Sequence, residues 1–284
     1  MIGTMTGERE LRSTFDQAAE IYQSARPSYP NSLYEDLIDL AGLRPDAELL
    51  EVGCGPGKAT VDLAQRGFKI IALEPGPHLA DQARRNLAGQ HSVEVITTTF
   101  EDWQPQPQDA FDLVYSATAW HWVDPAVRWA KAFSALKPDG CLAVFNANHG
   151  FPKGYDPIFD DFQQVYRAIG EGDLDRWPPP PPREDSELPE GDYEGADQFT
   201  AIAVRRYVWS QQYTADSYIA LLNTFSGHIA MGQAKRDQLY AGIRKLIAAR
   251  PDGTLTRHWA STLTIYRRRL ATAVDPSRAE GHPR

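Results

Sequence analysis

The most constraining feature of this chain is the segment LLEVGCGPG at residues 49–57. Its apolar run is too short for a helix and stops at glycines, which predicts a buried strand followed by a tight turn. Gly53, Gly55 and Gly57 free the backbone for this turn and let a ligand approach without a Cβ atom in the way. A helix over residues 58–65 would present its first N–H groups at the same place. The segment therefore predicts a ligand site at the end of a strand.

A carboxylate in the next strand suggests which ligand is bound. Residues 69–73 form a second apolar run, and Glu74 follows it directly. In α/β folds that bind nucleotides, an acid about 20 residues beyond the glycine turn accepts hydrogen bonds from ribose hydroxyls. The sequence therefore predicts a ligand that contains a nucleoside.

The spacing of the turn argues against two phosphate-binding motifs. The dinucleotide motif GxGxxG requires glycine at position 58, where this chain has Lys58. The nucleotide-binding motif that ends in Gly-Lys-Ser/Thr also fails, because Ala59 follows Gly57 and Lys58. Both mismatches weaken the case for a pyrophosphate or triphosphate ligand.

The pattern Glu51-x-Gly53-x-Gly55-x-Gly57 resembles the (D/E)xGxGxG motif of the class I methyltransferases, which use S-adenosylmethionine (SAM). Residues 111–116 (FDLVYS) resemble the fourth strand of that family, and residues 136–142 (LKPDGCL) resemble its LKPGG turn into the fifth strand. Residues 22–30 (YQSARPSYP) and 120–122 (WHW) are similar to a small-molecule branch related to trans-aconitate methyltransferases. The resemblance covers roughly residues 15–147, with weaker similarity over 199–266.

The resemblance implies SAM as the cofactor and a set of residues that contact it. Arg26 can pair with the methionyl carboxylate of SAM through a bidentate guanidinium, although an ordinary surface arginine is an equally open interpretation. Residues 99–101 match the segment that contacts adenine, and Phe100 is equally compatible with the core. We assign no metal ligands. The expected SAM-binding residues are Tyr22, Arg26, Glu51, Gly53, Cys54, Gly55, Glu74, Thr99, Phe100, Glu101 and Ser116.

Strands and helices alternate through the first half of the chain, which is typical of a doubly wound parallel sheet. We expect an α/β, Rossmann-like fold with a mostly parallel seven-stranded sheet, N-terminal helices and a C-terminal helical cap. The expected divisions are an N-terminal segment at 1–30 with a helix over 11–22, a SAM-binding core at 31–148, a cap helix with an acidic, proline-rich lid or linker at 149–198, the last strands with cap helices at 199–270, and a tail at 271–284.

The composition of the chain limits the kinds of substrate and cellular location that we expect. A formal net charge of −9 argues against a nucleic-acid substrate, because phosphate binding requires a basic surface. The two cysteines suggest no disulfide framework, and no apolar run is long enough to cross a membrane. We therefore expect a cytoplasmic protein, monomeric or weakly dimeric, whose acceptor is a small molecule.

The sequence constrains the catalytic and acceptor-binding residues less than the cofactor site. His121 follows the fourth strand and can accept a proton near neutral pH, but it can equally be a packing residue. Glu171 can serve as a base if it is buried, although a carboxylate in an acidic run is more often solvated. We expect the acceptor pocket to include Tyr29, Trp120, His149, Trp177 and Trp209.

Together these patterns predict methyl transfer from SAM to oxygen, nitrogen or carbon of a small organic acceptor. The aromatic residues favour an acceptor with apolar or aromatic bulk, such as a secondary metabolite, an isoprenoid or a carboxylic acid. A non-enzymatic SAM-binding regulatory module is the main alternative. An NAD-dependent oxidoreductase is a weaker one, since Lys58 disfavours a pyrophosphate site.

Overall fold

The structure of the protein is a computed structural model that describes residues 25–106, 110–172, 177–183, 188, 195 and 197–269. The predicted helix over 11–22, with Tyr22, lies outside these residues. The same is true of much of the acidic segment after residue 172 and of the tail from residue 271.

The first half of the chain forms the parallel part of one sheet. Its strands lie in the order β3 (Val93–Thr97), β2 (Lys69–Glu74), β1 (Glu48–Val52), β4 (Phe111–Ala117) and β5 (Leu136–Phe145). Each neighbouring pair is parallel. This arrangement confirms the predicted Rossmann-like α/β fold, and it brings the carboxyl ends of the strands together at one edge.

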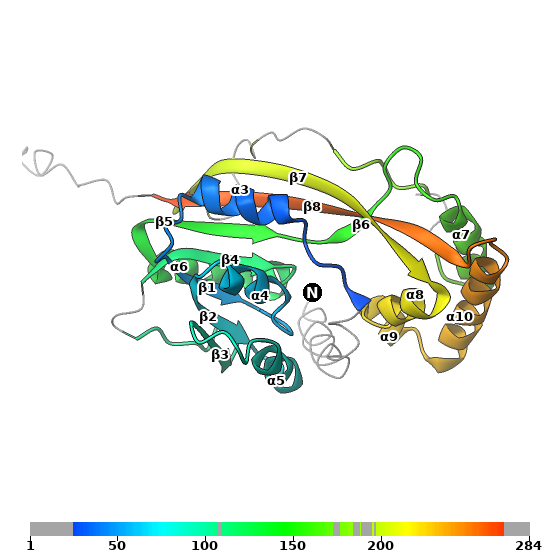
Figure 1. Cartoon of the computed structure of the whole chain (residues 1–284), viewed down its shortest axis with the longest axis horizontal. Coiled ribbons are helices and arrows are strands. Elements are labelled where there is room, and N and C mark those ends of the chain that lie inside the picture. Colours follow the sequence, from blue (N-terminus) through cyan, green and yellow to red (C-terminus); the bar gives the residue numbers. More distant parts are fainter. Residues whose placement is uncertain are drawn as a thin grey trace, which may run out of the picture.

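Helices cover both faces of this sheet, as Figure 1 shows. The helices α3 (Asn31–Ala41), α4 (Lys58–Gln65) and α5 (Pro77–Asn86) contribute to one apolar core, and α6 (Pro125–Ala135) contributes to a second core. The short 3-10 helix η1 (Trp120–Trp122) begins where the polypeptide leaves β4.

Three further strands complete the sheet. The strand β8 (Thr254–Arg268) runs antiparallel to β5, and β7 (Phe199–Thr214) runs antiparallel to β8 on its other edge. The short strand β6 (Asn148–Gly150) also pairs with β8, on the edge that faces β5. The described residues therefore contain eight strands rather than the seven expected. The additional strand is β6, which lies in line with β5 along the same edge of β8. The pairing with β8 stops at residues 146–147 and resumes at Asn148.

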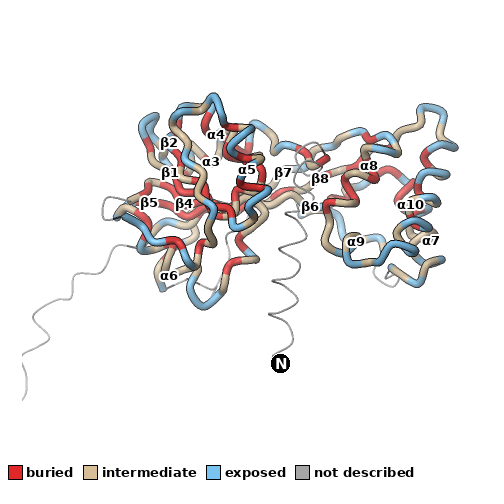
Figure 2. Tube along the Cα trace, turned by 90° about the horizontal axis from the view of Figure 1, so that it is seen from below, coloured by how far each residue is buried: buried red, intermediate tan, exposed pale blue. Residues whose placement is uncertain are grey.

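A helical cap stands at the far end of β7 and β8. Its helices are α7 (Ile158–Ala168), α8 (Ala215–Leu222), α9 (Ser226–Ala230) and α10 (Gln233–Ala248), and they enclose a separate apolar core around Trp259. The strands β7 and β8 contain 16 and 15 residues, which lets them run past the parallel strands and carry the cap. Figure 2 shows the two lobes joined through β6, β7 and β8. No helix of the described part combines the length and the apolar character needed to cross a membrane.

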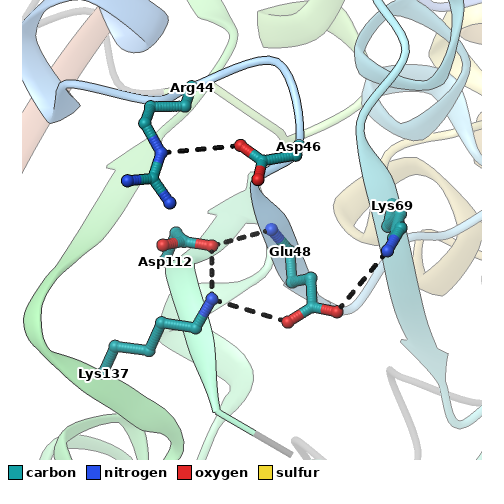
Figure 3. A network of polar contacts seen from close by, with 6 residues as sticks. All are labelled: Arg44, Asp46, Glu48, Lys69, Asp112 and Lys137. Carbon is teal, nitrogen blue, oxygen red and sulfur yellow. Dashed lines mark hydrogen bonds and ion pairs between the residues drawn. The ribbon is translucent and has the colours of Figure 1, made fainter.

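Polar contacts stabilise the amino ends of the parallel strands (Figure 3). Asp112 accepts hydrogen bonds from the backbone N–H of Glu48 at 2.9 Å and from Nζ of Lys137 at 2.8 Å. Partial burial acts to raise the pKa of Asp112, but these two hydrogen bonds hold it below its ordinary value. Because this network lies at the amino ends, it leaves the carboxyl ends of the strands open for the site described next.

Candidate active site

A cavity of about 670 Å³ lies at the carboxyl ends of β1, β2 and β4 and extends to the cap. Its walls include the glycine turn after β1, the loop after β2, residues 117–119 and 121–123 around η1, residues 147–149, the α8–α9 junction and Arg257 of β8. Core and cap thus contribute to a single space, which has the size of a small-molecule site.

The glycine turn is held by the neighbouring strand. The N–H groups of Gly53 and Cys54 both donate to the carbonyl oxygen of Leu73 at 2.9 Å. A Cβ atom on Gly53 would lie 2.5 Å from the Cβ of Ala119, so this glycine is required by close packing. Gly55 has a φ of +57°, and a Cβ atom there would meet no other atom within 4 Å. Its missing side chain therefore leaves open space at the wall of the cavity.

Glu74 joins the turn to the end of β2. Its two carboxylate oxygens accept hydrogen bonds from the N–H groups of Gly55 at 2.8 Å and Gly76 at 2.9 Å. The side chain lines the cavity and is almost fully buried. Each carboxylate oxygen can accept more than one hydrogen bond, so this position suits a ribose hydroxyl.

Glu51 lies beneath the turn and is completely buried. One of its oxygens accepts hydrogen bonds from Thr60 at 2.6 Å and Tyr115 at 2.7 Å, while Oε1 has no partner among the described residues. Burial raises the pKa of Glu51 to about 7; the hydrogen bonds from Thr60 and Tyr115 oppose this rise, and the charge of Glu74 adds to it. Glu51 lines the cavity and retains capacity to bind a donor group.

The residues expected at the adenine end also lie together. Thr99, Phe100 and Glu101 line the cavity. The ring of Phe100 stacks on that of Trp103, with 6.3 Å between the ring centres. Oε1 of Glu101 accepts the N–H of Asp124 at 2.9 Å, which connects this segment to the start of α6. Phe100 thus serves both the core and the cavity wall.

Arg26 connects the core side of the cavity with the cap. Its guanidinium donates to Oγ1 and the carbonyl oxygen of Thr224 at 2.8 and 3.0 Å, and it lies 4.1 Å from the ring centre of Phe225. Nζ of Lys58, at the start of α4, donates to the carbonyl oxygen of Arg26 at 2.6 Å. Burial lowers the pKa of Lys58 to about 8 despite the opposing charge of Asp62.

The residues expected around the acceptor divide into two groups. Tyr29, His121 and His149 line the cavity, and the hydroxyl of Tyr29 is 2.7 Å from Oγ1 of Thr118. Trp120 does not line it, because its ring is buried between Phe100 and Trp129 in the second core.

Four further expected residues lie elsewhere. Ser116 is buried in β4 and donates to the carbonyl oxygen of Val52 at 2.8 Å, so it supports the β1–β4 pairing. Trp177 donates to Asp160 of the cap, and Trp209 stacks on Trp259. Glu171 forms an ion pair of 2.7 Å with Lys235, and its side chain is 38% exposed. None of the four is among the residues that line the described cavity.

The sequence interpretation missed Arg257, whose side chain lines the cavity and is only 4% exposed. A signal was present, because buried and less buried residues alternate through β8 and Arg257 falls in phase with Leu255, Trp259 and Leu263. Thr118 was also missed. It has a φ of +60°, which is unusual for a residue with a side chain and reflects the sharp turn after β4.

The cavity residues fit SAM. The open space at Gly55 gives access to the backbone of the turn, Glu74 offers oxygens for a ribose, and Oε1 of Glu51 is an acceptor that lacks a partner among the described residues. Arg26 and Lys58 provide positive charge where an α-carboxylate would be attracted.

The chain is similar in sequence and fold to known methyltransferases. A methyltransferase domain family matches residues 50–144. An uncharacterized methyltransferase of Mycobacterium tuberculosis is 29% identical over 245 residues, which cover 86% of this chain and 89% of that protein. A trans-aconitate 2-methyltransferase of the same species is 32% identical over 40% of this chain and 42% of its own. The solved structure of a putative type II methyltransferase from Anaeromyxobacter dehalogenans has the same fold, with a TM-score of 0.57 and 21% identity over 85% of this chain and 97% of that one.

The glycine turn, Glu51 and Glu74 lie within the region matched by the methyltransferase domain, which also spans almost all of the parallel strands β1 to β5. The relative that matches most of this chain is also named a methyltransferase. This chain therefore contains a methyltransferase domain, and its sequence and fold resemble those of class I SAM-dependent methyltransferases.

Proposed function

We propose that this enzyme transfers the methyl group of SAM to a small organic acceptor that is enclosed between the core and the cap. The observation that carries the proposal is the shared cavity, in which the glycine turn and the cap residues Phe225 and Arg257 line the same space. A cofactor held at the turn would therefore be adjacent to a molecule held against the cap.

The cofactor, when bound, supplies an electrophilic methyl carbon on a sulfonium. The protein then has two tasks, which are to orient the acceptor and to exclude water, and proximity of this kind accounts for much of the rate of such displacements. Glu74 and the turn at Gly55 would hold the nucleoside, while Arg26 would hold the methionyl carboxylate.

His121 is the candidate to accept a proton if the acceptor must lose one. It lines the cavity from the middle of η1. His149 also lines the cavity, but burial, with the charges of Arg257 and His258, lowers its pKa to about 2. A histidine with such a low pKa is a weak base. Glu171 is unsuited to this role because it pairs with Lys235 outside the cavity lining.

The aromatic lining of the cavity supports the proposed acceptor class. Tyr29 and Trp122 on the core side and Phe225 in the cap provide aromatic surface, which favours an acceptor with apolar or aromatic bulk. The partial similarity to a trans-aconitate 2-methyltransferase also supports a small-molecule acceptor. The acidic net charge supports an enzyme that does not act on nucleic acid, and we propose that it works in the cytoplasm as a monomer or weak dimer.

The test is a screen of small organic acceptors with SAM labelled in its methyl group. We expect label to appear in a low-molecular-weight product with the wild-type enzyme and not with Gly55→Val. A protein that binds SAM tightly but labels no compound in a broad screen would contradict the proposal and favour a regulatory SAM-binding module.

A further inference from the structure

Arg257 is a buried cation for which the described residues provide no anionic partner. Its side chain is 4% exposed, and its guanidinium lies 4.3 Å from the ring centre of Trp259 and 5.3 Å from that of Phe225. Nε has no hydrogen-bond partner in the part of the chain that the structure describes. Over the same residues, Arg257 forms no ion pair with a carboxylate.

Among the described residues, the groups that act electrostatically on Arg257 are positively charged or neutral. They are the hydroxyls of Tyr218 and Tyr213 and the guanidinium of Arg26. The pKa values of His149 and His228 are lowered, first by burial and then by the charge of Arg257. Burial is thus the larger cause of both shifts, and the positive charge of Arg257 adds to it.

The carboxylate of Asp156 does not compensate this charge. It accepts hydrogen bonds from the N–H of Thr256 at 2.9 Å and from Arg250 at 2.8 Å, and it also accepts the N–H of Ile158. Asp156 therefore fixes the start of β8, immediately before Arg257, while its charge is paired with Arg250.

A buried charge without a partner destabilises a folded protein, because the energy of its lost hydration is not recovered. No described residue supplies an anion to Arg257, and because Arg257 lines the cavity, a ligand can supply one. We infer that Arg257 binds an anionic group of the acceptor, in the simplest case a carboxylate, at the cap end of the cavity, with His149 as a neutral hydrogen-bonding neighbour. This inference rests on the proposed function, since it assigns the acceptor to the same cavity.

The methionyl carboxylate of SAM is the other anion that the cavity would hold, and Arg26 is better placed for it. The carbonyl oxygen of Arg26 binds Lys58, which directly follows the glycine turn. Arg257 instead lies on β8 among cap residues, two positions from Trp259, whose ring is in the cap core. The two guanidinium groups lie near the same ring of Phe225, at 4.1 Å for Arg26 and 5.3 Å for Arg257, so what distinguishes them is the backbone link of Arg26 to Lys58 and the glycine turn.

The experiment uses the full chain saturated with S-adenosylhomocysteine, the product of the cofactor. Three carboxylates (acetate, benzoate and succinate) and their uncharged amides are titrated, and binding is followed by calorimetry and by the midpoint of thermal unfolding. The variants are Arg257→Met, which keeps the apolar stem, and Arg268→Met as a matched control. Arg268 is also on β8 and also lies over an aromatic ring, 4.2 Å from that of Phe133, but it is not part of the cavity lining.

We expect at least one carboxylate to bind the wild type and Arg268→Met, while its amide does not. Arg257→Met should lower the affinity for that carboxylate by at least about tenfold, which corresponds to losing a hydrogen bond to a charged group. Its affinity for S-adenosylhomocysteine should stay unchanged. In the absence of carboxylate, Arg257→Met should be at least as stable as the wild type, because it removes an uncompensated charge.

Two results would overturn the inference. The first is that none of the three carboxylates binds the wild type more tightly than Arg257→Met. The second is that Arg257→Met loses stability and S-adenosylhomocysteine affinity together, as expected for a packing residue or a cofactor ligand. Failure of the wild type to bind S-adenosylhomocysteine would instead count against the cofactor site, so the two failures are distinguishable.

Discussion

The carboxylate of Glu74 accepts a hydrogen bond of 2.8 Å from the backbone N–H of Gly55, which lies 19 positions earlier in the chain. This contact closes the glycine turn against the end of the neighbouring strand. It makes Glu74 both a part of the turn and a candidate ribose ligand, and the first two predictions test these roles.

Gly55→Val should abolish SAM binding while the protein remains folded. The valine side chain would occupy the open space at the cavity wall, and its φ of +57° is strained for a β-branched residue. Calorimetric titration with SAM is the measurement. Gly42→Val is the matched control, because Gly42 has a φ of +69° and open space but lies at the end of α3, away from the cavity lining. The control should lose stability and keep its affinity for SAM. Unchanged affinity in Gly55→Val would contradict the assignment of SAM to the glycine turn.

Glu74→Ala should weaken SAM binding by about 1 to 3 kcal/mol, the range for losing hydrogen bonds that involve a charged group. Glu74→Gln should be intermediate, because the amide retains one acceptor oxygen for the N–H of Gly55 or Gly76. Calorimetry with S-adenosylhomocysteine measures both variants. If all three proteins bind equally, the ribose is held by other residues.

The buried Glu51 should make stability fall as pH rises. Its pKa in the folded protein is raised from 4.5 to about 7, so the folded state holds this proton more tightly than the unfolded chain does. The resulting contribution to stability is complete below the unfolded pKa and is lost as the pH rises to about 7.

Glu51→Gln removes this titration. From about pH 5 to about pH 8, its free energy of unfolding should therefore rise by about 2 to 3 kcal/mol relative to that of the wild type. Urea denaturation at several pH values gives the difference. Tyr115→Phe removes a hydrogen bond that lowers the pKa of Glu51, so it should extend the pH-dependent range upward. Parallel pH profiles for the wild type and Glu51→Gln would contradict this prediction.

His121→Ala should lower kcat by about 10² to 10⁴ on an acceptor that must lose a proton, with the affinity for SAM unchanged. Glu171→Ala should leave kcat as in the wild type, because Glu171 pairs with Lys235 outside the cavity lining. Steady-state kinetics with an acceptor from the labelled screen measure both. If His121→Ala keeps its kcat and loses only thermal stability, His121 is a packing residue and positioning alone accounts for the rate.

Much of the fold was predictable because its signals are local. The apolar runs that form β1 and β2 end at glycine or at an acid, and their boundaries agree with the sequence interpretation to within one residue. The break after β5 was not predictable in this way. The short strand β6 exists because β8 is long enough to pair beyond the end of β5, and the length of a partner strand is not a local property.

The half of the site that we assign to the cofactor was largely predictable from sequence, since the residues from Glu51 to Gly57 are adjacent in the chain and Glu74 ends the neighbouring strand. The acceptor half was decided by tertiary structure. Trp120, Trp177 and Trp209 look alike in sequence, but each packs into a core or the cap because of contacts made far along the chain. Arg257 reaches the cavity only because β8 runs antiparallel past β5 and β6 and enters the cap. Local patterns fix strands, helices and turns, whereas the path of the chain through the sheet fixes which side chains share a cavity.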